Sequence, residues 1–366
     1  MFARTTRMLA GTAVVAGLVW MTAARTGVTA AVPDEGPVLQ SIGPMTFGPG
    51  GVLFAADTTG ATIYALDLGE QAAGGKDGAA DVAGIDQKIA AMLGTDAASV
   101  RVTDLVIHPK THNAYISVMR GTGADAKPAL MRVDGAGTIA PIAVDKLKYT
   151  KVALSNAPTP GTDGRRNPRA DSITDMAYVD GKLIVAGLSN EEFASKLWSV
   201  PYPFTTADRG TSVEIYHGNH GGFETRAPVM TFLPYRVGTE AMIVAAYTCT
   251  PLVKFGLDAL KPGQKVVGHT MMDLGAGNQP IDMIQYTKSG QGYLLMANSS
   301  FGVIKVPTAQ FATAPAITAK VDTAGSFERI ASMTGVQQLD ALDAQRSVAV
   351  TSATDGSRSL TITALP

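Results

Sequence analysis

The fold is decided by the stretch Ile281-Asp282-Met283-Ile284-Gln285-Tyr286, followed by Gly292-Tyr293-Leu294-Leu295-Met296-Ala297-Asn298 and Gly302-Val303-Ile304-Lys305-Val306. It predicts three short β-strands, because each piece is a short apolar or alternating run and turn residues separate the pieces. The first strand opens with an acidic residue before Met. The same three-strand unit recurs along the chain, so it defines the architecture.

Six copies of the unit align on the Met or Leu after the opening polar residue, at Met45, Leu105, Met176, Met230, Met283 and Leu339. Successive copies lie 53 to 71 residues apart, a near-regular period that indicates a radial array of small sheets. We therefore predict an all-β chain in which residues 32–366 form one domain, a six-bladed β-propeller. Seven blades is the alternative, if residues 144–171 conceal a degenerate copy.

The two ends of this array predict how the ring closes. The sixth copy has no fourth strand, because the chain stops at Pro366, while residues 37–42 precede the first copy and belong to no unit. A ring whose ends meet leaves no exposed sheet edge. We expect the segment at residues 37–42 to be a strand that completes the last blade. Residues 85–93 have helical spacing and predict a short helix on the outer side of the first blade.

Composition limits the classes of function. Hydrophobic residues make up 46% and charged residues 17% of the 366 positions, which is typical of a globular chain with a large core. The net charge is −1 and there is no basic cluster that could track phosphates, which argues against nucleic acid as a partner.

The first 31 residues predict a signal peptide. Arg4 and Arg7 precede an apolar run over residues 8–24, and Val28-Thr29-Ala30-Ala31 offers small residues for cleavage. The alternative is a permanent N-terminal anchor, because the run approaches the length that spans a bilayer. We expect bacterial general export, a periplasmic or secreted product, and no stable membrane span after processing.

The single cysteine, Cys249, excludes an intramolecular disulfide. The sequence contains no Cys-x-x-Cys-His motif, which excludes covalently attached haem. A lone thiol of this kind is either a buried apolar filler or a nucleophile that a neighbouring base or cation activates.

With these repeats, residues 37–366 resemble the secreted bacterial β-propellers of the broad YVTN, NHL and lactonase-like group. The resemblance lies in the blade pattern, and it implies an exported propeller that is either an enzyme or a binding protein. The chain departs from pyrroloquinoline-quinone propellers, which are Trp-rich at blade junctions, since its processed form would contain only Trp198.

Loops that enter the inner strands of a propeller share one face around the channel. Repeat symmetry places the strand-opening residues Asp104, Asp175 and Asp282 there in a ring. With Asn190 and Asn298 as neutral oxygen ligands they could hold Ca²⁺, a centre similar to that of calcium-dependent propeller lactonases. The alternative is structural, with each carboxylate accepting backbone N–H bonds from the neighbouring blade.

Two further groups of residues fall on loops at this face. His217-x-x-His220, with Glu224 or Cys249 as a third ligand, could bind a transition metal; ordinary loop hydrogen bonding is the alternative. Arg165, Arg166, Arg169 and Arg226 could make the channel mouth positive and read an anionic ligand, or they could be a solvated loop.

These observations support three hypotheses for function. The first is a binding module that recognises a small anionic ligand or a protein partner on the channel face, with Asn190, Asn298, Glu224, Cys249 and the four arginines as contacts. The second is a calcium-dependent hydrolase of the lactonase or esterase kind. The third is a periplasmic metal- or redox-linked accessory protein. Whether the chain is an enzyme is left open by these hypotheses.

Overall fold

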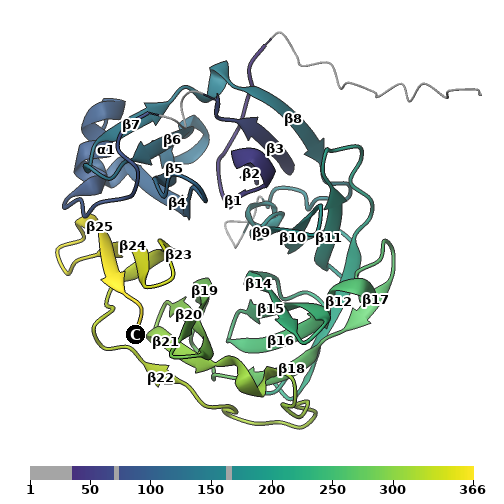
Figure 1. Cartoon of the computed structure of the whole chain (residues 1–366). Helices are drawn as coiled ribbons and strands as arrows, with labels where there is room; N and C mark the ends of the chain where they lie inside the picture. Colours follow the sequence, from purple (N-terminus) through teal and green to yellow (C-terminus); the bar gives the residue numbers. More distant parts are fainter. Residues whose placement is uncertain (1–34, 70–73, 162–166) are drawn as a thin grey trace, which may run out of the picture. The chain divides into compact units, whose positions relative to one another are not determined.

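The computed structural model describes residues 35–69, 74–161 and 167–366. They form six small sheets, antiparallel apart from one added outer strand, that are arranged around a common axis, so the fold is the six-bladed β-propeller that the repeats predict (Figure 1). The predicted signal peptide lies outside the described residues. None of the helices in the described part is long and apolar enough to cross a membrane.

The blades are numbered by the order of their innermost strands along the chain. Blade 1 contains β1 (Met45–Phe47), β2 (Leu53–Asp57), β3 (Thr62–Asp67) and β8 (Lys148–Ala153). Blade 2 contains β4 (Val100–Ile107), β5 (Ala114–Arg120), β6 (Lys127–Val133) and β7 (Ile139–Ile142). Blade 3 contains β9 (Asp175–Val179), β10 (Lys182–Leu188), β11 (Ser195–Pro201) and β12 (Thr211–His217), with β13 (Gly222–Glu224) and β17 (Lys265–Val267) added to β12.

The other three blades follow the same plan. Blade 4 contains β14 (Val229–Val237), β15 (Glu240–Tyr247), β16 (Pro251–Gly256) and β18 (His269–Asp273). Blade 5 contains β19 (Pro280–Lys288), β20 (Gln291–Asn298), β21 (Gly302–Pro307) and β22 (Glu328–Arg329). Blade 6 contains β23 (Val336–Ala341), β24 (Arg346–Ser352) and β25 (Arg358–Ala364). Short 3-10 helices cover Pro49–Gly51, Ala97–Ser99, Gly123–Asp125, Val144–Lys146, Pro168–Asp171, Leu257–Ala259 and Thr308–Phe311.

The core of the ring lies between the blades. The second strand of each blade is buried along most of its length, as in β2 and β10, because neighbouring sheets cover both of its faces. A strand covered on both faces is apolar without alternation. This explains why the middle piece of each repeat is a continuous apolar run.

The order of the blades around the ring differs from their order in the chain. The innermost strands contact one another in the order β1, β9, β14, β19, β23, β4 and then β1 again, so blade 2 lies between blades 6 and 1 (Figure 1). After blade 2 the chain returns to blade 1, where β8 pairs with β3 as the outermost strand. The described part of residues 144–171 therefore supplies an outer strand to blade 1 and does not form a seventh blade.

The predicted closure by the N-terminal segment is wrong. Residues 37–42 pair with no strand of blade 6; they run along blade 1, where the backbone N–H groups of Gln40 and Ser41 donate to the Asp57 carboxylate at 2.9 and 3.0 Å. The physical reason is the blade order, because blade 2 separates blade 1 from blade 6. The outer edge of blade 6 is met by Val82, which exchanges two backbone hydrogen bonds of 2.9 and 3.0 Å with Leu360.

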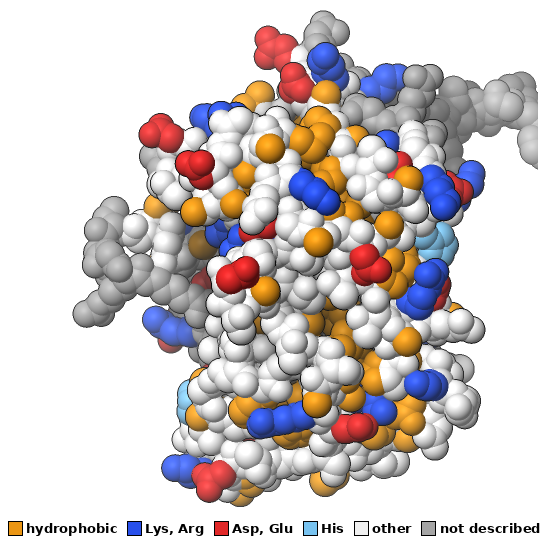
Figure 2. Space-filling view, turned by 90° about the vertical axis from the view of Figure 1, so that its left-hand side faces the viewer, with side chains coloured by type: hydrophobic (Ala, Val, Ile, Leu, Met, Phe, Trp, Pro, Cys, Tyr) orange, Lys and Arg blue, Asp and Glu red, His pale blue; other side chains and the backbone are white. Residues whose placement is uncertain are grey.

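Helix α1 (Ile85–Leu93) has the bounds that the periodicity predicts, but not the predicted place. It packs against β25 and β4, and Ile85 and Ile89 are buried in the cluster that joins blades 6 and 2. The helix therefore covers this junction and not blade 1. Figure 2 views the ring from this side, where acidic and basic side chains of the described residues are interspersed over the surface.

Candidate functional site

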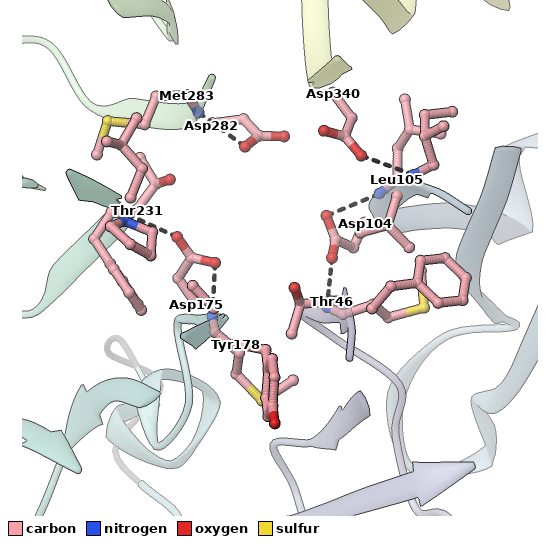
Figure 3. Close-up of a pocket in the computed structure, with 18 of the residues that line it drawn as sticks. Thr46, Asp104, Leu105, Asp175, Tyr178, Thr231, Asp282, Met283 and Asp340 are labelled. Atoms are coloured by element: carbon pink, nitrogen blue, oxygen red, sulfur yellow. Dashed lines mark hydrogen bonds between the residues drawn. The ribbon is translucent and has the colours of Figure 1, made fainter. Parts of the chain in front are cut away.

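A pocket of about 540 Å³ lies at the centre of the ring and is called the channel pocket. It is lined by residues of all six innermost strands, and four aspartates converge on it: Asp104, Asp175, Asp282 and Asp340 (Figure 3). The structure thus brings the three predicted aspartates together and adds a fourth that the repeat alignment missed.

Each of the four carboxylates accepts two backbone hydrogen bonds. One oxygen accepts from the next residue in its own strand and the other from the neighbouring blade. The donors and N···O distances are Leu105 (2.8 Å) and Met45 (2.5 Å) to Asp104, Met176 (2.7 Å) and Phe232 (2.7 Å) to Asp175, Met283 (2.8 Å) and Leu339 (2.9 Å) to Asp282, and Ala341 (2.7 Å) and Ile107 (2.7 Å) to Asp340. The aspartates therefore tie adjacent blades together.

The three predicted aspartates come from blades 2, 3 and 5, which alternate with blades 1, 4 and 6 around the ring. In blades 2, 4, 5 and 6 a register irregularity precedes this point of the inner strand, such as the one between Val102 and Asp104. A bulge of this kind re-aims a side chain. Asp340 adds a carboxylate from blade 6, between blades 5 and 2, so the four aspartates come from blades 2, 3, 5 and 6, and the irregularity accompanies three of them.

Burial raises the pKa of all four carboxyl groups. The pKa of Asp175 and the pKa of Asp340 rise from 3.8 to about 6 through desolvation, which outweighs their backbone hydrogen bonds. The pKa values of Asp104 and Asp282 rise well above the ordinary value, because repulsion from the other carboxylates adds to desolvation. The channel pocket is therefore an acidic cavity that disfavours an additional anion.

The two predicted amide ligands do not line the channel pocket. Asn298 is buried at the end of β20, where its amide donates to the carbonyl oxygens of Met296 and Gly302. Asn190 is exposed, and its backbone N–H donates to the Asn156 carbonyl at 2.7 Å. Of the five calcium ligands predicted from the sequence, only the three aspartates therefore meet at the channel pocket in the described chain.

A second cavity of about 550 Å³ lies beside blades 3 and 4 and is called the histidine pocket. It is lined by side chains of the β12–β13 hairpin, of residues 225–228 and of the loop at Thr248 and Cys249. The structure brings His217, His220, Glu224, Arg226 and Cys249 to this one cavity, although the sequence assigned them to two separate hypotheses, the binding module and the metal-linked accessory protein.

The β12–β13 hairpin sets the geometry of the two histidines and the glutamate. Its register pairs His217 with Gly222 and Ile215 with Glu224, so His217 and Glu224 are diagonal neighbours on one face. The turn closes with the Gly221 N–H donating to the His217 carbonyl at 2.8 Å, and Gly221 has a φ of +71°, which favours glycine. A tight turn therefore folds His220 back over His217.

The Glu224 carboxylate bonds both imidazoles. Its Oε2 lies 2.9 Å from His217 Nδ1 and its Oε1 bonds His220 Nδ1, while the two rings have centroids 3.8 Å apart and planes tilted by 32°. The hydrogen bond with His217, followed by that with His220, lowers the pKa of Glu224. Glu224 is therefore an ionised carboxylate placed between two imidazoles.

The far side of the His217 ring faces a buried acid. His217 is only 1% exposed, and its Nε2 makes no hydrogen bond within the described residues. The Nε2 atom lies 3.9 Å from Oδ2 of Asp273. Asp273 is fully buried and was missed by the sequence argument, because it ends an outer strand, β18, and belongs to no motif.

The remaining lining residues differ in character. Cys249 is a half-buried free thiol in the left-handed region, with a φ of 58°, and its sulfur does not join the close group of the other three. The side-chain oxygen of Thr248 is buried without a partner in the described chain. Phe223 is 62% exposed and stands against Tyr216.

The predicted arginine cluster is divided. Arg165 and Arg166 lie outside the described residues. Arg169 donates to the carbonyl oxygens of Thr59 and Pro158 at 2.8 and 2.9 Å, so its guanidinium holds a loop in place. Arg226 lines the histidine pocket and is exposed.

The fold and these two cavities define the chain as a six-bladed β-propeller with an acidic channel and a lateral histidine pocket. No family model and no curated protein matches it. Among solved structures, it is similar to a pyrroloquinoline-quinone-bound aldose sugar dehydrogenase from Streptomyces coelicolor (13% identity, TM-score 0.33, covering 92% of this chain and 100% of that one). It is also similar to a virginiamycin B lyase from Staphylococcus aureus (9% identity, TM-score 0.34, covering 89% and 96%).

A further similar structure is the extracellular domain of a putative one-component system from B. thetaiotaomicron, at 10% identity and a TM-score of 0.34, where the match covers 89% of this chain and 38% of that one. Similarity at this level carries no argument. The six-bladed fold of this chain rests on its own strand pairing.

Proposed function

We propose that this propeller binds a divalent transition metal ion in the histidine pocket, with His217, His220 and Glu224 as ligands. One observation carries the proposal. The ligand atoms of these three side chains lie within 4.8 Å of one another, and within the described residues no other group of three such side chains meets this criterion. Imidazole nitrogens with a carboxylate suit zinc and its neighbours in the first transition series.

The geometry supports an ion at the point where the hydrogen bonds now meet. Two ligands of a tetrahedral zinc ion, with bonds of about 2.1 Å, lie about 3.4 Å apart. His217 Nδ1 and Glu224 Oε2 are 2.9 Å apart and need to widen slightly, whereas the most separated ligand atoms of the group, within 4.8 Å, need to approach each other. The lowered pKa of Glu224 supplies an ionised carboxylate. The ion would replace the protons that Glu224 shares with the two rings.

Asp273 supports the proposal from behind the ligands. When Nδ1 of His217 binds the ion, Nε2 carries the proton and faces Asp273 Oδ2. At 3.9 Å the two atoms are not hydrogen-bonded, and Asp273 Oδ2 also accepts from the Asn219 N–H at 3.0 Å. A shift of the ring toward Asp273 would form the hydrogen bond by which a carboxylate orients a metal-bound imidazole and makes it a better ligand. In this role Asp273 is a positioning residue.

Three protein ligands leave a tetrahedral ion with one position for an outside molecule. This arrangement favours a metal-dependent binding function over a purely structural ion. It combines the metal-linked accessory hypothesis with the binding-module hypothesis and moves the ligand from the channel mouth to the histidine pocket. Export through a cleaved signal peptide is part of the same proposal.

We do not propose a cation in the channel pocket. Each aspartate there already uses both oxygens for backbone N–H groups, and Asn190 and Asn298 do not line the cavity. A calcium ion prefers six to eight oxygen ligands. The interblade hydrogen bonds support a structural role for the ring of aspartates.

The experiment measures metal affinity on chelator-treated protein by titration with Zn²⁺ and Co²⁺, and stoichiometry by elemental analysis. We expect one ion per chain. We expect His220→Ala, at a half-exposed position, and the isosteric Glu224→Gln each to weaken metal binding by at least about tenfold. Loss of a residue that only supports a ligand already weakens metal binding by about ten- to a hundredfold, so loss of a ligand should cost at least the lower of these values.

The matched control is His269→Gln, which removes a half-buried histidine that bonds the Ala314 carbonyl away from the pocket. It should retain the metal affinity of the unaltered chain. The proposal fails if the unaltered chain takes up no ion at micromolar concentration. It also fails if both His220→Ala and Glu224→Gln bind as tightly as the unaltered chain.

A further inference from the structure

We infer that the histidine pocket, once it holds its ion, binds a small organic carboxylate, whose charge pairs with Arg226 and whose apolar part rests on Phe223. This inference rests on the proposed metal site and adds the class of ligand. It is carried by the open coordination position, the charge of the pocket, the arginine and the apolar rim.

The cavity has room in front of the ion. Cys249 lines the cavity without joining the close group of three ligand atoms, so the thiol is not placed to fill a fourth position on the ion. The volume of about 550 Å³ falls in the range of small-molecule sites. A ligand with a few carbon atoms beyond its metal-binding group fits this space.

The ion changes the sign of the local charge. Glu224 and Asp273 contribute one negative charge each and Arg226 contributes one positive charge, which leaves a formal charge of minus one with neutral histidines. A divalent ion changes this to plus one. An anion is therefore disfavoured before the metal binds and favoured afterwards, so binding of the two is coupled.

Arg226 lines the pocket and is the group expected to bind the carboxylate. Among the described residues, four other arginines pair with acids, in the contacts Arg209–Glu191, Arg236–Asp180, Arg346–Asp343 and Arg358–Asp86. No such pair involves Arg226 in the part of the chain that the structure describes. A guanidinium binds a carboxylate through two parallel hydrogen bonds, a geometry that lysine lacks.

The rim of the pocket favours an organic ligand over an inorganic ion. Phe223 is 62% exposed, one of the few large apolar side chains of the described chain in that state. Its ring meets Tyr216 edge-on at 5.2 Å, which holds it at the rim beside Ala227 and Pro228. An aromatic or aliphatic group on the ligand would cover this surface.

The test uses the full processed chain loaded with Co²⁺, whose visible spectrum reports a change of ligand, and benzoate as the probe. Acetate lacks the ring, benzamide lacks the charge and phosphate lacks the carbon skeleton. We expect benzoate to bind only the metal-loaded chain and to bind more tightly than the other three. Arg226→Gln should weaken benzoate about tenfold or more without changing metal affinity. The control Arg236→Gln should change neither.

The outcomes separate the two proposals. If the unaltered chain binds no metal, the proposed function itself fails. If metal binds, the inference is overturned when benzoate leaves the spectrum unchanged, when the metal-free chain binds benzoate equally well, or when Arg226→Gln keeps full affinity. Phosphate binding as tightly as benzoate overturns the organic class of ligand.

Discussion

Replacing Asp175 with asparagine tests whether the aspartate ring costs stability at neutral pH. Asp175 Oδ1 and Oδ2 accept the N–H groups of Met176 and Phe232, both at 2.7 Å, and its pKa is raised from 3.8 to about 6 by burial. Asparagine has the same shape but does not ionise. The substitution therefore removes the charge and keeps one of the two acceptor oxygens.

The sign follows from which state holds the proton more tightly. With a raised pKa in the fold, the native chain binds more protons than the unfolded chain between about pH 4 and 6, so this group lowers the stability as the pH rises through that window. A rise from 3.8 to about 6 corresponds to about 3 kcal/mol in the free energy of unfolding. This stabilisation of the fold by protonated Asp175 is complete below about pH 4 and lost above about pH 6.

Asp175→Asn should therefore behave differently at the two ends of this range. At pH 4 the native carboxyl is protonated and resembles the amide, so the two chains should differ by about 1 kcal/mol or less, the value of one hydrogen bond. At pH 7 the variant avoids the cost of ionisation and should gain up to about 3 kcal/mol relative to the unaltered chain.

Urea unfolding followed by circular dichroism at pH 4, 5, 6 and 7 measures the difference. The control is Asp355→Asn, where an exposed carboxylate has its pKa lowered by hydrogen bonds from Ser357, so its pH trend should have the opposite sign. A difference between Asp175→Asn and the unaltered chain that stays constant from pH 4 to 7, or that grows more destabilising, refutes the reasoning.

Three further predictions concern the metal site, the closure of the ring and export. Asp273→Asn should weaken Zn²⁺ binding by about ten- to a hundredfold although Asp273 is no ligand, and unchanged affinity by titration would remove it from the site. Val82→Pro deletes an N–H that donates to Leu360 and should lower the free energy of unfolding in urea by about 1 to 3 kcal/mol. Val38→Pro, at a position 77% exposed, should lower it by no more than about 0.5 kcal/mol. A larger loss for Val38→Pro than for Val82→Pro would support closure by the N-terminal segment. Mass spectrometry of the chain recovered from an exporting bacterium should show a new N-terminus near Ala31, and a retained Met1 would contradict processing.

Local pattern predicted much of the fold and part of the site. Strands and turns followed from alternation and glycines, and the helix at Ile85–Leu93 from its apolar spacing. Asp104, Asp175 and Asp282 meet at the channel because they share one position in the repeat. The repeat does not predict Asp340, because Gln338 occupies the position that aligns with Asp104, Asp175 and Asp282, and the acidic residue follows two positions later.

The histidine pocket shows the limit of pattern more clearly. The spacing His217-x-x-His220 with Glu224 nearby is common in loops, and only the β12–β13 register brings all three ligand atoms together. Asp273 arrives from blade 4, far along the chain, so no local signal connects it with His217.

By itself, then, the sequence determined the repeated strand unit, the number of blades and the three carboxylates that blades 2, 3 and 5 direct toward the axis, because these depend on neighbours a few residues apart. The tertiary structure alone decided that blade 2 lies between blades 6 and 1, that Val82 and not the N-terminal segment meets the edge of the last sheet, and that the hairpin of blade 3 opens beside Cys249. These features depend on which sheets pack against each other. Packing buries similar apolar faces in either blade order, so no short stretch of sequence encodes the choice.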